Sequence, residues 1–224
     1  MQLCIVMPVL NEAAGIADAL SALAPLKARG VQLVVADGGS RDATTNIVQA
    51  RGDTVISSAP GRALQMNAGA QASSATVLLF LHADTLLPDH ADQLIAQALA
   101  SGNAVWGRFD VHIAGQSRML PVVAALMNWR SRISGIATGD QAMFMRRAAF
   151  DAAGGFSVQP LMEDIEMSKR LLKLSRPACL RAKVITSGRR WDTRGLWRTI
   201  VLMWRLRFAY WRGAAPERLA QLYK

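Results

Sequence analysis

The sequence has 224 residues, 51% hydrophobic and 19% charged, which is enough for one sizeable core and too apolar for a disordered chain. No apolar stretch reaches the roughly 20 residues that span a bilayer. The apolar run Leu3 to Leu10 has no basic residue before it, which is unlike a signal peptide. We therefore expect one domain over residues 1–224, located in the cytoplasm and without a transmembrane anchor.

The formal net charge of +10 is concentrated at the end of the chain. Residues 1–167 hold 11 Lys and Arg against 14 Asp and Glu, whereas residues 168–224 hold 15 against 2. This asymmetry predicts an anionic partner for the C-terminal segment. Cys4 and Cys179 lie in apolar segments without metal-ligand spacing, so we expect two small buried side chains and neither a disulfide nor a zinc site.

In the first half of the chain, short β-type runs alternate with helical runs. The pattern predicts strands at Leu3–Val9, Val31–Ala36, Thr54–Ser57 and Val77–Leu81, and helices at Glu12–Arg29, Arg41–Arg51 and Arg62–Gln71. Such alternation favours an α/β fold with a mainly parallel sheet between helices. Ligands of open parallel sheets bind beyond the carboxyl ends of the strands, so we expect a site there.

The second half has a less regular pattern and is expected to be α+β. It predicts strands or apolar runs at Val105–Ile113, Ala142–Met145 and Cys179–Thr186, and helices at Ser117–Ser134 and Glu163–Leu174.

Polar residues follow three of the predicted strands: Asn11 and Glu12 the first, Asp37 the second, and His82 and Asp84 the fourth. Neither GxGxxG nor a P-loop motif accompanies them, so a different nucleotide-binding mode is needed. The Asp37 carboxylate suits hydrogen bonds from a base or ribose, or it forms an Asx turn with the glycines behind it. Asp84 suits Mg²⁺ or Mn²⁺, which are often held by one or two carboxylates and substrate phosphates, or it is an ordinary turn residue.

Further polar groups occur later in the chain. Glu163 and Asp164 stand at the start of a predicted helix. One interpretation is that their negative charge is stabilised by the helix macrodipole, and the other is that one of them acts as a general base. Asp140 and Gln141 lie in a predicted loop that suits an acceptor pocket. The loop Arg189-Arg190-Trp191 offers planar cations for phosphate oxygens, or is simply a solvated basic loop. Arg62 suits a further phosphate or base contact.

The C-terminal segment, residues 192–224, combines apolar and basic stripes at helical spacing. The favoured interpretation is a helix that packs on the core while its arginines extend to water. Docking of residues 194–212 on an anionic membrane surface and a homodimer interface are the alternatives.

In order and spacing, six segments resemble the family 2 inverting glycosyltransferases, which have the GT-A fold. They are Met7–Glu12, Ala36–Ser40, Leu81–Thr85, Gly154–Phe156, Glu163-Asp164 and Arg189–Trp191. The resemblance implies a nucleotide-sugar-binding half over residues 1–90, an acceptor and catalytic half over 91–191, and a basic amphipathic C-terminal segment.

The resemblance also implies roles for individual residues. Asp164 is the expected catalytic base, Asp84 the expected metal ligand, and Glu163, Asp140 and Gln141 are expected on the acceptor side. The expected donor is a UDP-sugar. The residues expected to bind this nucleotide sugar are Pro8, Leu10, Glu12, Asp37, Arg62, His82, Ala83, Arg190 and Trp191.

His82 departs from the family pattern, which has Asp at this position, so the site has one carboxylate fewer for a cation. The segments Glu163–Glu166 and Ser187–Trp191 resemble those of a small bacterial subgroup described as radical-SAM or selenodomain associated. The resulting hypothesis is a metal-assisted, inverting transfer of a sugar to an acceptor hydroxyl. The alternative is a non-catalytic α/β module that binds an anionic membrane or nucleic acid through its basic segment, and of these two partners nucleic acid is not expected.

Overall fold

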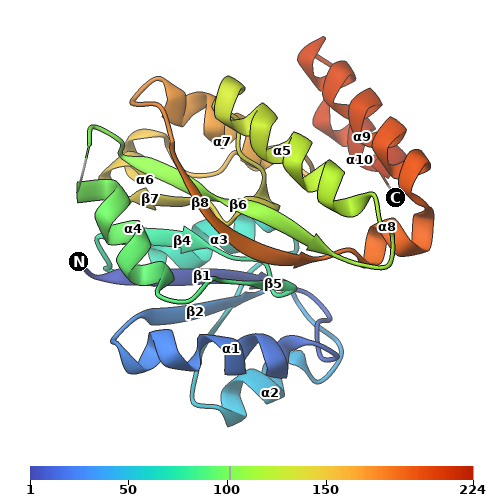
Figure 1. Ribbon diagram of the computed structural model, residues 1–224. Helices are drawn as coiled ribbons and strands as arrows, with labels where there is room; N and C mark the ends of the chain where they lie inside the picture. Colours follow the sequence, from blue (N-terminus) through green and yellow to red (C-terminus); the bar gives the residue numbers. More distant parts are fainter. Residues whose placement is uncertain (101, 224) are drawn as a thin grey trace.

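Among residues 1–100 and 102–223, which the computed structural model describes, eight strands form one mixed sheet with the order β3-β2-β1-β4-β7-β6-β8-β5 (Figure 1). The strands are β1 (Leu3–Val9), β2 (Gln32–Asp37), β3 (Thr54–Ser57), β4 (Val77–Phe80), β5 (Thr85–Leu86), β6 (Trp106–Ala114), β7 (Phe144–Arg146) and β8 (Ala178–Ser187). The helices are α1 (Ile16–Ala28), α2 (Thr44–Ala50), α3 (Arg62–Gln71), α4 (Ala91–Ala100), α5 (Leu120–Ser134), α6 (Arg147–Ala152), α7 (Glu163–Leu172), α8 (Arg189–Arg194), α9 (Leu196–Trp211) and α10 (Pro216–Tyr223), with a 3₁₀ turn at Gly139–Gln141.

The strands from the first part of the sequence pair in parallel. Strand β1 pairs in parallel with β2 and β4, and β2 pairs in parallel with β3. Strand β7 then lies antiparallel between β4 and β6, while β8 is parallel to β6 and antiparallel to β5. The predicted mixed, mainly parallel α/β sheet is therefore confirmed, and strands from both halves of the sequence share it.

Alternating side chains of β1 enter two apolar cores, one on each face of the sheet. Leu3, Ile5 and Met7 pack in the core that also contains buried residues of α1, α4 and α5. Cys4 and Val6 pack in the core of α3, α6 and α7. Strand β1 is buried along its whole length, as expected for a strand covered by helices on both faces.

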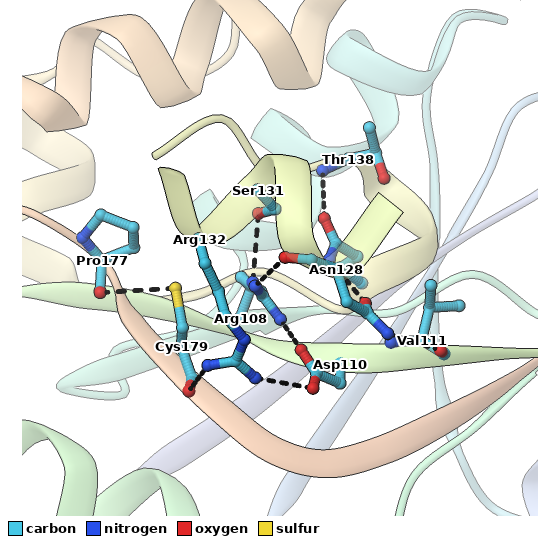
Figure 2. Close-up of polar contacts among 10 residues, drawn as sticks. Arg108, Asp110, Val111, Asn128, Ser131, Arg132, Thr138, Pro177 and Cys179 are labelled. Atoms are coloured by element: carbon cyan, nitrogen blue, oxygen red, sulfur yellow. Dashed lines mark hydrogen bonds and ion pairs between the residues drawn. The ribbon is translucent and has the colours of Figure 1, made fainter. Parts of the chain in front are cut away.

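A buried ionic network joins β6 to α5 (Figure 2). Arg108 is fully buried and is paired with Asp110, and Arg132 of α5 donates to the second Asp110 oxygen at 2.6 Å. Arg108 also donates to the Ser131 hydroxyl and to the Asn128 carbonyl, each at 3.1 Å. Because an unpaired buried charge is costly, these contacts hold α5 in one position on the sheet.

Asn128 extends this network toward the 3₁₀ turn (Figure 2). Its side chain pairs with the backbone of Val111 and accepts a hydrogen bond from the Gln141 amide at 3.2 Å. The Gln141 oxygen in turn accepts from the Thr138 backbone N–H, also at 3.2 Å. The core therefore fixes the loop that precedes β7.

The helical pair α9 and α10 packs on the start of α7. Buried Leu206 of α9 and Leu219 of α10 form a small apolar cluster with Leu161, Met162 and Ile165. On its other face, α9 leaves an apolar stripe open to solvent. The exposed members of this stripe are Trp197 (71% exposed), Val201, Trp204 (72%), Phe208 and Trp211 (78%).

This exposure overturns the favoured interpretation of the C-terminal stripe, because the aromatic side chains do not enter the core. In α9, only Thr199 and Leu206 are buried. Helix α5 likewise exposes Leu126, Trp129 and Ile133. Within the described part of the chain, every helix is too short or too polar to cross a bilayer.

Several boundaries differ from those predicted. Helix α1 begins at Ile16 instead of Glu12, and it is preceded by a turn in which the N–H groups of Gly15 and Ile16 donate to the Glu12 carbonyl. Glu12 N–H donates to the Thr44 hydroxyl at 2.8 Å, and Ala13 N–H donates to Asp42 at 3.1 Å. Helix α2 starts at Thr44 instead of Arg41, and the Thr44 N–H donates to Asp42 at 3.0 Å. Elements α4, α6 and β5 were not predicted, and Cys179 is partly exposed instead of buried.

Candidate active site

A cleft of about 340 Å³ opens at the carboxyl ends of β1 and β4, within the volume range of small-molecule sites. The ends of these strands and the first turn of α3 form its walls. The lining residues are Pro8, Val9, Leu10, Glu12, Gly61, Arg62, Gln65, His82, Ala83 and Asp84. The structure thus brings together seven residues predicted from the sequence, and adds Val9, Gly61 and Gln65.

Gln65 ties the ends of two strands together at the back of the cleft. Its side-chain amide donates to the carbonyl of Val9 at 2.7 Å and to that of Ala36 at 2.9 Å. Gly38 lies so close that a Cβ atom there would stand 3.0 Å from the Gln65 amide. A lone glutamine inside a helical run gives no sequence signal, and this residue was missed for that reason.

Two carboxylates, Glu12 and Asp84, line the same cleft. Burial raises the pKa of Glu12, and the negative charge of Asp84 raises it further, against the opposing charges of Arg189 and Arg62. Asp84 is exposed to the cleft, and its Oδ1 accepts from the Thr85 hydroxyl at 3.3 Å. A divalent cation would relieve this repulsion, so the residues present fit a metal ion.

The described residues contain no group of three or more His, Cys, Asp and Glu side chains that would hold a metal unaided. A cation at Asp84 therefore needs further ligands from a bound molecule or from water, which is the usual arrangement for Mg²⁺ with substrate phosphates.

His82 forms the wall between the cleft and the loop before β7. Its Nδ1 lies 3.6 Å from Asp140 Oδ1, and a Cβ atom at Gly139 would stand 2.5 Å from the imidazole. Only glycine therefore fits opposite this ring. Although burial raises the pKa of Asp140, the hydrogen bond and charge of His82 and the charges of Arg62 and Arg190 outweigh it and lower that pKa overall.

Asp164 lies beyond His82, in the first turn of α7. Its Oδ2 accepts the Gly139 N–H at 2.9 Å, and its Oδ1 accepts the Ile165 N–H at 2.7 Å. A small cavity of about 10 Å³, room for about one water, is lined by Asp164, Glu163 and His82 among others. The cleft and the Asp164 cavity therefore share the His82 side chain.

The backbone before α7 is strained. Met162 has a φ of 67°, in the left-handed backbone region that residues other than glycine rarely adopt. It is held there by burial in the cluster with Leu206 and Leu219. Backbone strain of this kind persists only where the surrounding structure imposes it. Here it fixes the backbone from which Glu163 and Asp164 project at the start of α7.

Arg190 reaches the same cluster of charges from α8, which is a short helix and not the predicted loop. Burial lowers the pKa of Arg190, as do the charges of Arg194 and Arg62, while Asp140 and Asp84 raise it. Its guanidinium carbon stands 4.1 Å from the centre of the Tyr223 ring. One nitrogen, Nη1, is buried and has no hydrogen-bond partner among the described residues.

Three predicted residues lie apart from the open cleft. Asp37 is 5% exposed, and its oxygens accept the N–H groups of Gly39 and Ser40, which is the Asx turn held open as an alternative. Gln141 is fully buried and bonded to Asn128 and Thr138, so in this conformation it supports the loop and cannot touch an acceptor. Trp191 packs partly buried against the apolar core of α1, α4 and α5.

Comparison with known families gives one match, in which the Glycosyl transferase family 2 model covers residues 4–154. The chain belongs to glycosyl transferase family 2. The matched range includes every residue that lines the cleft, whereas Asp164 and Arg190 of this family 2 chain lie beyond it. A search of curated proteins found no match.

Solved structures share the fold. S. aureus TarS 1-349, solved in complex with UDP-GlcNAc, has a TM-score of 0.67 at 17% identity over 84% of this chain and 58% of its own. The mannosyltransferase PcManGT from Pyrobaculum calidifontis, in complex with GDP-Man and Mn²⁺, has a TM-score of 0.66 at 19% identity over 99% and 68%.

Glucosyl-3-phosphoglycerate synthase from Mycobacterium tuberculosis, in complex with Mn²⁺ and UDP-Glc, has a TM-score of 0.60 at 20% identity over 83% of this chain and 70% of its own. This family 2 chain therefore spans less than two thirds of the length of the TarS chain, and slightly more than two thirds of the length of the other two chains. The expected GT-A type of fold is confirmed.

Glu163 generates a pH-dependent prediction. It is 6% exposed, and burial, then the charge of Asp164, raises its pKa. The folded protein therefore retains a proton that the unfolded chain releases near pH 4.3, and it loses stability as the pH rises from that value through the raised pKa. We expect Glu163→Gln to melt at least about 2 °C above the wild type at pH 7 and at the same temperature below pH 4.

Thermal unfolding followed by circular dichroism at several pH values measures this difference, with the exposed Glu217→Gln as the control. A Glu163→Gln protein that gains no stability at pH 7 would contradict the raised pKa.

Proposed function

We propose that the protein transfers a sugar from a nucleotide diphosphate sugar, a UDP-sugar in the first instance, to an acceptor hydroxyl with inversion at the anomeric carbon. The observation that carries this proposal is the shared His82 wall, with Glu12, Arg62 and Asp84 on one side and Asp164 on the other. Family membership and relatives solved with UDP-GlcNAc, UDP-Glc and GDP-Man support it.

In this proposal the donor occupies the 340 Å³ cleft. Pro8, Leu10 and Ala83 supply apolar walls, and Glu12 lies on the nucleoside side. Asp37 acts on that side through the Asx turn that it holds at the end of β2, and not from within the cleft. Arg62 and Arg190 face the diphosphate, where a planar guanidinium matches phosphate oxygens. The unpartnered Nη1 of Arg190 supports this role, because a buried donor without an acceptor is satisfied when an anion binds. Trp191 positions Arg190 from behind.

Asp84, with Glu12 beside it, is the proposed place for a divalent cation. A bound Mg²⁺ or Mn²⁺ ion would neutralise charge that develops on the departing diphosphate. Relatives solved with Mn²⁺ support a divalent metal, and the repulsion that raises the pKa of Glu12 supports this position.

Asp164 is the proposed general base. Its two oxygens are oriented by the N–H groups of Gly139 and Ile165, and each retains a lone pair for an acceptor hydroxyl. Held in this way, Asp164 takes the hydroxyl proton as the acceptor oxygen forms its bond to the anomeric carbon and the carbon–oxygen bond to the diphosphate breaks. Glu163 and Asp140 flank this position on the acceptor side.

We further propose that the enzyme works in the cytoplasm at an anionic membrane surface and belongs to the bacterial radical-SAM or selenodomain-associated subgroup. The segments Glu163–Glu166 and Ser187–Trp191 support the subgroup. The exposed aromatic stripe of α9 supports the membrane surface, because Trp and Phe beside Arg suit the headgroup region. A homodimer through the same stripe is the competing arrangement.

Binding of the donor nucleotide tests the proposed function directly. We expect calorimetric titration with UDP to show binding that strengthens at least about tenfold with Mn²⁺, and we expect Asp84→Ala to lose that gain, because a carboxylate ligand is removed. Asp89→Ala, which removes an exposed carboxylate in the following loop, is the control. Failure of UDP, GDP and dTDP alike to bind the wild type would overturn the proposal.

Removal of the base separates turnover from binding. We expect Asp164→Asn to lower kcat at least about a hundredfold while UDP binding stays within about twofold, because the general base acts only as the transition state forms. The readout is UDP release from a UDP-sugar, alongside the calorimetric titration. An unchanged kcat in Asp164→Asn would remove this residue from the role.

Vesicle binding tests the membrane surface. We expect sedimentation with vesicles of phosphatidylglycerol, but not of phosphatidylcholine alone, and we expect Trp197→Ser with Trp204→Ser to weaken it at least about tenfold. Leu222→Ser, an exposed apolar residue of α10 outside the stripe, is the control. A concentration-dependent dimer without vesicle binding would favour the homodimer instead.

A further inference from the structure

Two arginines beside Asp164 have buried nitrogen atoms without hydrogen-bond partners. Nε and Nη2 of Arg130 on α5, and Nε of Arg207 on α9, are shielded from solvent and lack any partner among the described residues. The partly buried Arg147, by contrast, donates to three backbone carbonyls. Each unsatisfied buried donor costs about 1–3 kcal/mol, so this pair requires a physical explanation.

The two guanidinium groups also repel each other. Burial lowers the pKa of Arg130 to about 10, and the charge of Arg207 contributes to this shift. Burial lowers the pKa of Arg207 as well. A guanidinium keeps its proton in proteins, so both side chains are cations whose charges interact in a desolvated region, an arrangement that an anion would stabilise.

Asp164 is too far from either arginine to be its ion-pair partner. Its charge acts on both, raising their pKa values, but neither forms an ion pair with it, and its oxygens accept the backbone N–H groups of Gly139 and Ile165. Asp140 acts on Arg207 in the same way, from a position where it faces His82. The positive charge next to the proposed base is therefore only partly balanced.

Both arginines are held by structure on either side. Arg130 lies between Asn128 and Arg132, which the buried network fixes to β6 (Figure 2). Arg207 follows Leu206, which is buried against Leu161, Met162 and Ile165 at the start of α7. A ligand would find these cations already in place, so little conformational entropy would be lost on binding.

We propose that Arg130 and Arg207 bind a phosphate group carried by the acceptor, beside the hydroxyl that Asp164 deprotonates. Two cations match the charge of a phosphate monoester, and its oxygens satisfy the free guanidinium N–H groups. The acceptor is accordingly a hydroxyl compound with a phosphate near the reacting oxygen, either a small metabolite or a lipid headgroup. This inference rests on the proposed glycosyl transfer.

Inorganic phosphate is the probe for this site. The full chain is first saturated with UDP and Mg²⁺, so that the nucleotide covers Arg62 and Arg190, and phosphate is then titrated while thermal unfolding is followed. We expect phosphate to raise the melting temperature of the wild type, and its apparent Kd to weaken at least about tenfold in Arg130→Met and in Arg207→Met.

Arg218→Met, which removes an exposed arginine of α10, is the matched control and should keep the phosphate response. In phosphate-free buffer we expect Arg130→Met and Arg207→Met to melt no lower than the wild type, because an unpaired buried charge is lost. UDP binding in the same samples reports that the variants are folded. Equal phosphate responses in these variants and in Arg218→Met would overturn the inference.

Competition with the bound phosphate distinguishes the two sources. Displacement by glycerol 3-phosphate favours a soluble acceptor, and displacement by phosphatidylcholine vesicles that contain phosphatidic acid favours a lipid. Failure of the inference is separable from failure of the proposed function, because UDP binding is measured on its own. A protein that binds UDP with metal but shows no Arg130- and Arg207-dependent phosphate response keeps the donor site and loses only the acceptor assignment.

Discussion

Parallel pairing of β1 with β2 and β4 is the constraint on which the site depends. Because the three strands run in one direction, their carboxyl ends reach the same edge, and whatever follows each strand in the sequence must meet there. Gln65 then fastens the ends of β1 and β2 through two carbonyl groups. Glu12 and Asp84, which are 72 positions apart in the sequence, therefore line one cleft without any direct bond between them.

The polar network of the core serves the site as well as the fold. Figure 2 shows its part from Asp110 on β6, through Arg108, to Asn128 on α5. From Asn128 it continues to Gln141, and so to the loop whose Gly139 N–H orients Asp164. Hydrogen bonds of this kind have direction, unlike apolar contacts, so they fix one arrangement of the loop. Gln141 therefore matters through the loop it holds, although no solvent reaches it.

Local sequence patterns predict the structural features that depend on neighbouring residues. They miss the features that depend on residues distant in the sequence. The alternation of strand and helix patterns predicted the mainly parallel sheet, and the resemblance to family 2 supplied most of the residues that line the cleft. The start of α1 was misplaced, because the turn before it is bonded to Thr44 and Asp42, which are distant in the sequence. The α9 stripe has the periodicity of a core helix, and only the packing of Leu206 on Leu161 shows which face turns inward. Arg207 gave no signal for the same reason.

Helix α9 presents two different surfaces. Trp197, Trp204 and Trp211 point to solvent, while Leu206 and Arg207 face the start of α7 and the charge of Asp164. One helix thus carries both surfaces. A partner that immobilises its outer face would therefore also immobilise Arg207 on its inner face. Such linkage is reciprocal. If a partner on the outer face raises the affinity for the anion by some factor, the bound anion raises the affinity for that partner by the same factor.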